Sequence, residues 1–331
     1  MRLRWWWILL AVALAGCHRR GSEAPLRLGF FPNLTHAQAL VGDAEGTFQE
    51  ALQGRPLEIK RFNAGPSAME ALLAGELDAT YVGSGPVINA YVRSHGALKV
   101  IAGSASGGAE LVARTARSAR DLKGMKVATP QLGNSQDIAL RFWLAQQGLA
   151  ASVAGRGDVT IVPVENADIL TLFRRGELEA AWLPEPWAAR LLAEDGAHIL
   201  VDERELWPGG RFPTTVLVAS TAALASRPAE IEAILRAHLA LTERARRDPR
   251  KFADEANQAF GKLTRQALPP AILHDAFSRI QLTTDPMAPE LAIAAKHAAQ
   301  LGFVASEDVS GLVDRTLLDR AAKGIGGSGK R

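Results

Sequence analysis

The sequence predicts an α/β fold with two lobes, and a repeated phrase carries this prediction. Residues 75–86 fit the end of a helix, a short buried strand and a turn that opens a new helix. Gly75 suits the left-handed position that closes a helix, and Pro86 suits the first turn of the next one, where its missing N–H costs nothing. A near copy of the phrase stands at 176–186. We therefore expect one α/β unit in each half of the chain; the alternative is a chance recurrence of a common pattern.

The composition allows two lobes and excludes nucleic acid as a partner. A chain of 331 residues, 47% of them hydrophobic, is long enough to bury a separate core in each lobe. The net charge is +3, and the basic residues are scattered apart from short runs at 244–251 and at the two ends. Because no basic stripe with interleaved aromatic residues is present, nucleic-acid binding is not expected.

The N-terminal residues are expected to be a targeting segment. Two arginines precede an apolar run at 5–15, which is too short to span a bilayer comfortably. The sequence Leu-Ala-Gly-Cys follows at 14–17 and resembles the bacterial lipobox; Cys17 is the only cysteine of the chain. The resemblance implies a lipoprotein signal peptide at 1–17, a tether at 18–25, and a mature protein held by lipid at Cys17 on the extracytoplasmic side of a membrane. The alternative is a buried free cysteine after a chance apolar run.

Strand-like and helix-like segments alternate in the first part of the chain. Strands are expected at 26–31, 57–62, 78–82 and 98–104, and helices at 35–48, 65–75 and 86–94. Thr35 and Ser67 fit N-cap positions, since each is followed three residues later by Gln or Glu. A βαβαβ run of this kind predicts a mainly parallel sheet with crossover helices on its faces.

A second lobe is expected between two crossing segments at 104–108 and 208–213, which are rich in small residues, glycine and proline. Within it, strands are expected at 109–114, 125–129, 159–162 and 199–201, and helices at 135–147 and 167–175. Asn134 or Ser135 fits the cap of the first of these helices.

The chain then returns to the first lobe. A strand at 215–219 is expected to rejoin the first sheet, and the rest fits helices near 231–239, 251–260, 271–279, 290–300 and 312–322. These boundaries assign 26–106 and 214–322 to lobe 1, 107–213 to lobe 2 and 323–331 to a flexible tail.

Uncharged polar side chains stand where strands end and helices begin. They are Asn33, Thr35, Ser67, Ser84 beside Gly85, Asn134, Ser135 and Gln136. Ligands of open parallel sheets bind beyond the carboxyl ends of the strands, and helix N-termini offer free N–H groups with a partial positive charge. The pattern predicts reversible capture of a small oxyanion by neutral donors. The alternative is that each side chain only caps its own helix.

The repeated phrase adds two candidates from the second half of the chain. If the two units match, Ser84 and Glu185 lie at equivalent strand ends and face each other across the cleft. Trp187 follows directly and either walls the cleft or packs in a core.

Other chemistries have weaker support. No two of the seven histidines lie within five residues of each other, so a metal site is not expected. The sequence contains neither a glycine-rich phosphate loop ending in Lys-Ser/Thr nor a Gly-x-Ser-x-Gly elbow. The second hypothesis is an exported enzyme with Ser106 as nucleophile and Glu185 as general base, which requires the two side chains within hydrogen-bond reach.

Taken together, these segments resemble the solute-binding proteins of ABC importers for nitrate, taurine and aliphatic sulfonates. The resemblance spans roughly 26–220 and is carried by the residues at 30–37, 65–67, 83–86, 133–137 and 185–187. It implies a type II periplasmic-binding fold with a ligand in the cleft between the lobes. It also implies a monomer that uses no cofactor, catalyses no reaction and delivers its ligand to the transmembrane subunits of an ABC permease.

Carried over by motif, the ligand loops are those at Asn33, Ser67, Ser84, Asn134–Gln136 and Glu185. Glu185 fits this scheme badly, because an acid would face an anion. Either it turns outward, or it pairs with the amino group of a zwitterion such as taurine, or the ligand is a pyrimidine-type compound. The cysteine-rich motif of the pyrimidine-synthesising relatives is absent.

Overall fold

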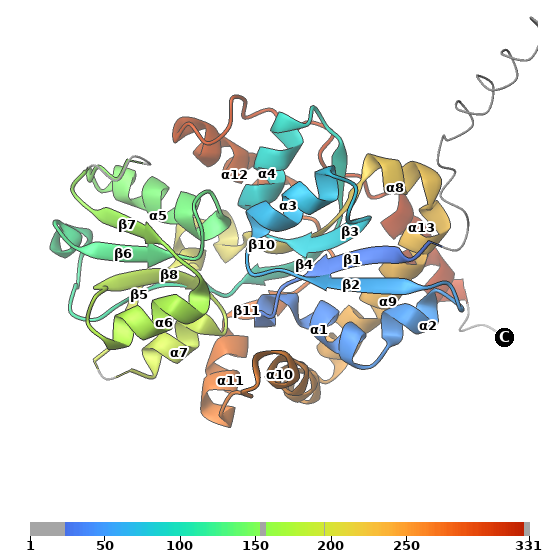
Figure 1. The fold of residues 1–331 in the computed structure, drawn as a ribbon, viewed down its shortest axis with the longest axis horizontal. Coiled ribbons are helices and arrows are strands. Elements are labelled where there is room, and N and C mark those ends of the chain that lie inside the picture. The colour runs from blue at the N-terminus through green and yellow to red at the C-terminus, as the bar shows by residue number, and fades with distance from the viewer. Residues whose placement is uncertain (1–23, 153–156, 195, 328–331) are drawn as a thin grey trace, which may run out of the picture.

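The computed structural model describes residues 24–152, 157–194 and 196–327 and contains two sheets, each with helices on both faces (Figure 1). We call each sheet, with the helices that cover it, a lobe. The strand order is β11-β4-β10-β3-β1-β2 in the first lobe and β7-β6-β8-β5-β9 in the second. The two-lobed α/β architecture expected from the repeated phrase is therefore confirmed.

The strands come from separate stretches of the chain. Those of the first lobe are β1 (Leu26–Phe30), β2 (Leu57–Arg61), β3 (Ala79–Val82), β4 (Leu98–Gly107), β10 (Pro213–Ser220) and β11 (Ile280–Leu282). Those of the second lobe are β5 (Ala109–Ala113), β6 (Lys126–Thr129), β7 (Thr160–Pro163), β8 (Ala180–Pro184) and β9 (His198–Asp202).

Both sheets are mixed, which corrects the expectation of mainly parallel sheets. The pairs β1–β2, β1–β3, β6–β7 and β6–β8 are parallel, whereas β10 runs antiparallel to β3 and β4, and β5 runs antiparallel to β8 and β9. In each lobe an antiparallel strand next to a crossing segment, β10 in the first lobe and β5 in the second, lies beside the parallel βαβ unit. The third strand of each unit, β3 or β8, therefore occupies the same place in its sheet. The glycines that precede these strands, Gly75 and Gly176, both have a φ of +73°.

The helices fill the layers on either side of the sheets. In the first lobe they are α1 (Ala37–Ala44), α2 (Thr47–Ala51), α3 (Gly65–Leu73), α4 (Ser84–Arg93), α8 (Thr221–Ser226), α9 (Pro228–Arg247), α10 (Pro249–Thr264), α11 (Pro270–Ser278), α12 (Ala288–Gln300) and α13 (Thr316–Gly327). In the second lobe they are α5 (Ser135–Gln146), α6 (Asn166–Arg174) and α7 (Trp187–Leu192). Short 3-10 turns lie at Leu34–His36, Ala119–Leu122, Glu203–Leu206 and Pro208–Gly210.

Each face of each sheet has its own apolar core. In the first lobe α1, α9 and α10 pack on one face, and α3, α4 and α12 pack on the other. In the second lobe α5 packs on one face, and α6 and α7 pack on the other. Because helices cover both faces, the central strands are buried throughout: β3, β8 and β5 each have only buried residues.

Several elements differ from the predicted ones. The helix expected at 35–48 is divided into a 3-10 turn, α1 and α2, because Gly46 takes a left-handed conformation with a φ of +77°. Strand β11 was not predicted, and it pairs with β4 at the crossing between the lobes. Helix α13 continues to Gly327, into the stretch assigned to a flexible tail, and 328–331 lie outside the described residues.

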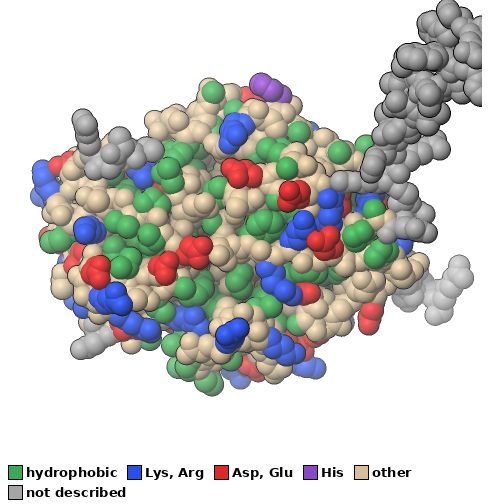
Figure 2. Space-filling view, viewed as in Figure 1, with side chains coloured by type: hydrophobic (Ala, Val, Ile, Leu, Met, Phe, Trp, Pro, Cys, Tyr) green, Lys and Arg blue, Asp and Glu red, His purple; other side chains and the backbone are tan. Residues whose placement is uncertain are grey.

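The predicted signal peptide with Cys17 also lies outside the described residues. Among the described helices, none combines the length and the apolar character needed to cross a bilayer. Figure 2 shows basic and acidic side chains interspersed over the face in view. The residue at which one lobe passes into the other stays a prediction.

Gly103 in β4 is expected to be indispensable for packing. A Cβ atom at this position would lie 1.9 Å from the backbone oxygen of Asp285, and backbone cannot move aside as a side chain can. Gly103→Ala should therefore lower the free energy of unfolding by at least about 2 kcal/mol in urea denaturation. Gly324→Ala in α13 is the control, since a Cβ there meets nothing within 4 Å. Equal stability of the two variants would contradict the packing seen around β4.

Candidate functional site

A cavity lies between the lobes, beyond the ends of strands from both sheets. It is formed by the loops after β1, β2 and β3 in the first lobe and after β6, β7 and β8 in the second, together with the start of β10. Its volume is about 40 Å³. A water molecule needs roughly 10–15 Å³ measured in this way, so the cavity holds a group about three waters in size.

Five of the described helices begin at this cavity, three from the first lobe and two from the second. They are α1, α3 and α4 in the first lobe and α5 and α6 in the second; residues at or next to the start of each line the cavity. The first turn of a helix has N–H groups without intrahelical partners and carries a partial positive charge. The backbone therefore makes this space favourable for an anion before any side chain is considered.

The side chain of Asn33 adds a donor from the first lobe. Its Oδ1 accepts a hydrogen bond of 2.9 Å from Nε1 of Trp187. An indole N–H can only donate, so the amide oxygen must face Trp187 and the amide nitrogen must lie on the other side. Asn33 lines the cavity, and Nδ2 has no hydrogen-bond partner among the described residues. Asn33 thus presents N–H groups, not a carbonyl oxygen, to a ligand.

Gln136 adds a donor from the second lobe by the same logic. The backbone N–H of Asp137 donates to Oδ1 of Asn134 over 2.8 Å, which caps α5 and fixes the amide of Asn134. Nδ2 of Asn134 then donates to Oε1 of Gln136 over 3.3 Å. Because Oε1 of Gln136 is occupied, its Nε2 is the atom that remains to donate hydrogen bonds into the cavity that Gln136 lines. One backbone N–H therefore sets the polarity of both amides.

His36 and Ser135 follow the same pattern. The backbone N–H of Phe31 donates to Nδ1 of His36 over 3.4 Å, which leaves Nε2 as the protonated nitrogen. Burial lowers the pKa of His36 to about 3, so the imidazole is neutral at physiological pH. The backbone N–H of Gly85 donates to Oγ of Ser135 over 3.0 Å, so the hydroxyl hydrogen of Ser135 is left for a ligand or for Oγ of Ser84, which lies 3.5 Å away. Both side chains line the cavity as neutral donors.

The cavity wall contains no Lys, Arg, Asp or Glu from the described ranges. Two of its oxygen atoms are buried without a hydrogen-bond partner, Oδ1 of Asn166 and Oγ1 of Thr215. At the rim, Nδ2 of Asn63 in the first lobe donates over 3.1 Å to Glu165 in the second. The site is therefore rich in donors, electrically neutral and bridged by contacts between the lobes.

A second, smaller cavity lies behind the α4–α5 contact and has a carboxyl group in its wall. Ser84, Gly85 and Glu203 line it. Both oxygens of Glu203 accept from indole N–H groups, over 2.9 Å from Trp182 and 3.3 Å from Trp207. Burial raises the pKa of Glu203 to about 8, so this carboxyl group is largely protonated at neutral pH.

The structure brings together part of the predicted site. Asn33, Thr35, Asn134, Ser135 and Gln136 line the main cavity. Ser84 and Gly85 line the smaller cavity, so Ser84 does not face Glu185. Thr35 is not the N-cap of α1, since His36 holds that position.

Ser67, Trp187 and Glu185 lie apart from the main cavity. Ser67 is exposed in the first turn of α3, where its hydroxyl donates to the backbone oxygen of the N-cap residue, Ala64. It borders an open groove outside the cavity. Trp187 packs behind Asn33 and acts on the cavity only through its N–H group. Glu185 turns into the protein instead of facing a ligand, which answers the difficulty raised by an acid in this loop.

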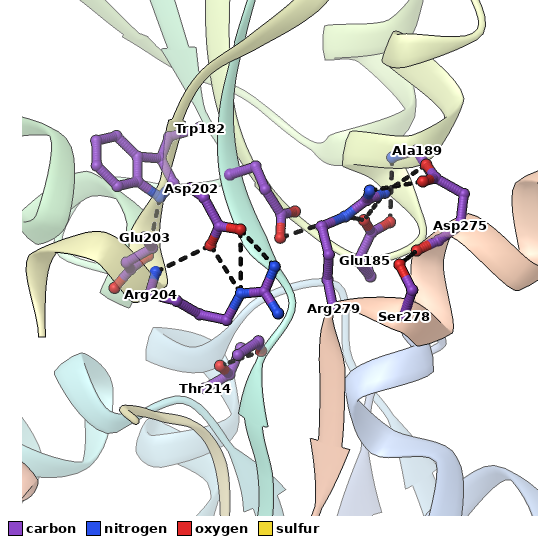
Figure 3. A network of polar contacts seen from close by, with 12 residues as sticks. Trp182, Glu185, Ala189, Asp202, Glu203, Arg204, Thr214, Asp275, Ser278 and Arg279 are labelled. Atoms are coloured by element: carbon purple, nitrogen blue, oxygen red, sulfur yellow. Dashed lines mark hydrogen bonds and ion pairs between the residues drawn. The ribbon is translucent and has the colours of Figure 1, made fainter. Parts of the chain in front are cut away.

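Glu185 belongs to a buried ionic network with Arg279 (Figure 3). Nε and Nη2 of Arg279 lie 2.8 and 2.6 Å from Oε1 of Glu185, and the backbone N–H of Ala189 donates to Oε2. Arg279 also contacts Asp275 in α11 and lies 3.5 Å from Oε1 of Glu110 in β5. It therefore ties the C-terminal part of the first lobe to two strands of the second.

Glu110 is the least satisfied member of this network. It has no exposed surface, and neither of its carboxyl oxygens has a hydrogen-bond partner in the described structure. Burial raises its pKa well above the ordinary value; the neighbouring Glu185 adds to the shift, and Arg279 opposes it. Burial also raises the pKa of Glu185, against the opposing effect of Arg279. Two buried carboxyl groups thus share one cation, and the surroundings of Glu110 favour its protonated form.

The described part of the chain places no basic hydrogen-bond partner at Ser106 and contains no metal-binding cluster. Oγ of Ser106 accepts from the backbone N–H of Phe212 over 3.2 Å and has no basic group as a partner there. The described residues also include no group of three or more His, Cys, Asp and Glu side chains placed to hold a metal ion.

Comparison with known proteins identifies the family. Residues 20–260 match the NMT1-like family. This chain belongs to the NMT1-like family. The match extends over both lobes and includes the loops that form the main cavity.

Curated relatives of this NMT1-like protein are binding proteins. A putative binding protein of Brucella abortus is 25% identical over 232 residues, which are 69% of this chain and 67% of the relative. A putative aliphatic sulfonates-binding protein of Escherichia coli is 28% identical over 214 residues, 62% of this chain and 63% of the relative. The taurine-binding periplasmic protein of Escherichia coli is 25% identical over 177 residues, 52% of each chain.

Solved structures share its fold. The alkanesulfonate-binding protein SsuA of Xanthomonas axonopodis, bound to MOPS, has a TM-score of 0.70 at 18% identity, covering 91% of this chain and 98% of its own. The periplasmic nitrate-binding protein NrtA of Synechocystis has a TM-score of 0.76 at 15% identity, covering 92% of this chain and 89% of its own. The two-lobed periplasmic-binding fold is thereby confirmed.

Removing the cation of the buried network should be costly. Arg279→Met leaves the carboxyl groups of Glu185 and Glu110 buried without a positive partner, so we expect the free energy of unfolding at pH 7 to fall by about 3–5 kcal/mol. The loss should shrink towards pH 5, because protonation removes the uncompensated charge. Urea denaturation at the two pH values measures both effects. The control is Arg315→Met, because Arg315 is 55% exposed and pairs with an equally exposed Asp319. A similar loss of stability in both variants would argue against the network.

Glu203 should make stability depend on pH. Since its pKa is about 8 in the folded protein and its ordinary value is 4.5, the stabilisation is complete below about pH 4.5 and disappears as the pH rises through 8. The expected loss is on the order of 4 kcal/mol for a fully buried group. Glu203→Gln should make this slope shallower even if its absolute stability is lower, and the part that remains comes from Glu110 and Glu185. The exposed Glu205→Gln variant is the control, and melting temperatures between pH 4.5 and 9 distinguish the two. A slope as steep in Glu203→Gln as in the wild type would assign it to another group.

Proposed function

We propose that this protein is an extracytoplasmic substrate-binding protein of an ABC importer, and that it captures a small oxyanion such as a sulfonate, taurine or nitrate between its lobes. The observation that carries the proposal is that hydrogen-bond donors from both lobes face the cavity. Asn33 and Gln136, one from each lobe, both have their oxygens occupied by internal donors and turn their N–H groups to the ligand. The oxyanion group of a sulfonate, of taurine or of nitrate presents hydrogen-bond acceptors only.

The surrounding groups support the same ligand class. Helix N-termini from both lobes converge on the cavity, and neutral His36 and Ser135 add donors. A neutral wall suits a ligand that must be released again, because no ion pair has to be broken. The names of the relatives point the same way, since they include sulfonate-, taurine- and nitrate-binding proteins.

Two details favour particular members of the class. The volume of about 40 Å³ suits a compact anionic head group. The buried oxygen of Asn166 lacks a donor, and a ligand with an amino group, such as taurine, supplies one. An aminosulfonate therefore meets more of the cavity's requirements than nitrate does.

The proposal includes a location and a partner. The resemblance of 14–17 to a lipobox supports lipid attachment at Cys17, with 18–25 as the tether to the membrane. Ligand capture would close the lobes by a hinge motion about the crossings near 104–108 and 209–213, and the closed monomer would deliver its ligand to the permease subunits of the importer. Binding, not catalysis, is proposed: Ser106 has no base within reach among the described residues.

A ligand panel tests the function directly. We expect taurine, alkanesulfonates or nitrate to raise the melting temperature of the mature domain, because a ligand that binds only the folded state stabilises it. Methanesulfonate and methanesulfonamide form a matched pair of similar shape, and only the anion should bind. Stabilisation by the sulfonamide or by a cation, with none by any oxyanion, would reject the proposal.

Gln136→Glu tests the polarity of the cavity. The substitution is isosteric and keeps an oxygen for Asn134, but it replaces the ligand-facing N–H₂ by a carboxylate oxygen. We expect the affinity for the oxyanion to fall by at least about 100-fold at pH 7, since a hydrogen bond becomes a charge repulsion. Gln146→Glu, exposed at the other end of α5, should change the Kd little. Calorimetry compares them, and unchanged affinity in Gln136→Glu would remove this residue from the site.

A further inference from the structure

Trp187 is held between the two lobes. It is the first residue of α7 in the second lobe, and its ring meets Phe260 of α10 in the first lobe edge-to-face at 6.4 Å. The guanidinium of Arg190 lies over the indole at 5.0 Å. Packing on both sides fixes the direction of the indole N–H group, which is the property that a positioning residue needs.

Two hydrogen bonds connect the corner formed by residues 185–187 with the loop that follows β1. The indole Nε1 of Trp187 donates to Oδ1 of Asn33 over 2.9 Å, and the backbone N–H of Leu34 donates to the backbone oxygen of Glu185 over 3.1 Å. Both cross from one lobe to the other. The direction of the side-chain amide of Asn33 is thus determined by a residue of the other lobe, Trp187.

We propose that Trp187 is a specificity-determining positioning residue: it turns the amide of Asn33 so that only N–H groups face the cavity, and it does so when the lobes close. The inference rests on the proposed function and deepens it. Without the indole donor the amide of Asn33 can rotate by half a turn, and its oxygen would then repel an oxyanion. Trp187 therefore contributes to the choice of acceptor ligands without touching the ligand.

A double-mutant cycle on the Kd tests this role. Trp187→Phe removes the N–H and keeps an aromatic ring; it should weaken binding of the best oxyanion of the panel by about tenfold, through lost preorganisation. Asn33→Ala should weaken binding as well. Since Trp187 acts through Asn33, adding Trp187→Phe to Asn33→Ala should change the Kd by less than about twofold. Trp143→Phe, a buried tryptophan replacement on α5, controls for the loss of indole packing and should leave the Kd unchanged.

The outcomes separate the two levels of the proposal. If Trp187→Phe weakens the wild type and the Asn33→Ala variant by the same factor, Trp187 acts by packing alone and the positioning role is wrong. Unchanged affinity in Trp187→Phe would reject it equally. If the wild type binds no oxyanion, the proposed function fails, and the role of Asn33 as an oxyanion donor fails with it.

Discussion

The ion pair between Arg279 and Glu185 is the contact on which the relative position of the two lobes depends. Arg279 directly follows α11 of the first lobe, and Glu185 directly follows β8, a central strand of the second. Fixing Glu185 fixes the corner at 185–187, from which Trp187 reaches Asn33. A contact near the crossing segments is thereby connected to a donor in the cavity. The cost of burying the ions is offset by hydrogen bonds to the remaining N–H and oxygen positions, as such pairs require.

Charge is kept out of the ligand cavity and concentrated beside the crossings. Arg279, Glu185 and Glu110 are all buried, yet none of them lines the cavity. A cation in the cavity would strengthen the capture of an anion, but it would also oppose release to a partner. Neutral N–H groups with fixed directions give selectivity for acceptors at a smaller cost of desolvation. Beside the crossings the charged pair has a different effect, since in a dry environment it holds two elements in one relative position.

Much of the fold follows from local pattern, whereas much of the site does not. The repeated phrase predicted two equivalent units because helix termination, strand burial and turn formation depend on neighbouring residues. The loops of Asn33 and Asn134–Gln136 were found from strand ends and capping residues, and they line the cavity. Arg279 was missed, because its role depends on a contact with Glu185 that is distant in the sequence. The direction of the Glu185 side chain was unpredictable for the same reason. His36 lies in the segment 30–37 that carries the family resemblance, but only its contact with the backbone N–H of Phe31 shows that its imidazole is a neutral donor.

The two copies of the repeated unit differ in the residues that follow their third strands, and these residues have different roles in the two lobes. After β3, Gly83 leads into α4, whose N-terminus approaches α5 of the other lobe so closely that the N–H of Gly85 bonds with Ser135. After β8, the position equivalent to Ser84 holds an acid, Glu185, that turns inward to Arg279, and the chain continues into a tryptophan that orients a donor. The first copy therefore supplies a helix N-terminus to the cavity, and the second supplies the anchor that positions the facing loop. Equivalent places in two similar folds have acquired complementary roles, because a cleft between lobes needs both a surface for the ligand and a fixed relation between its walls.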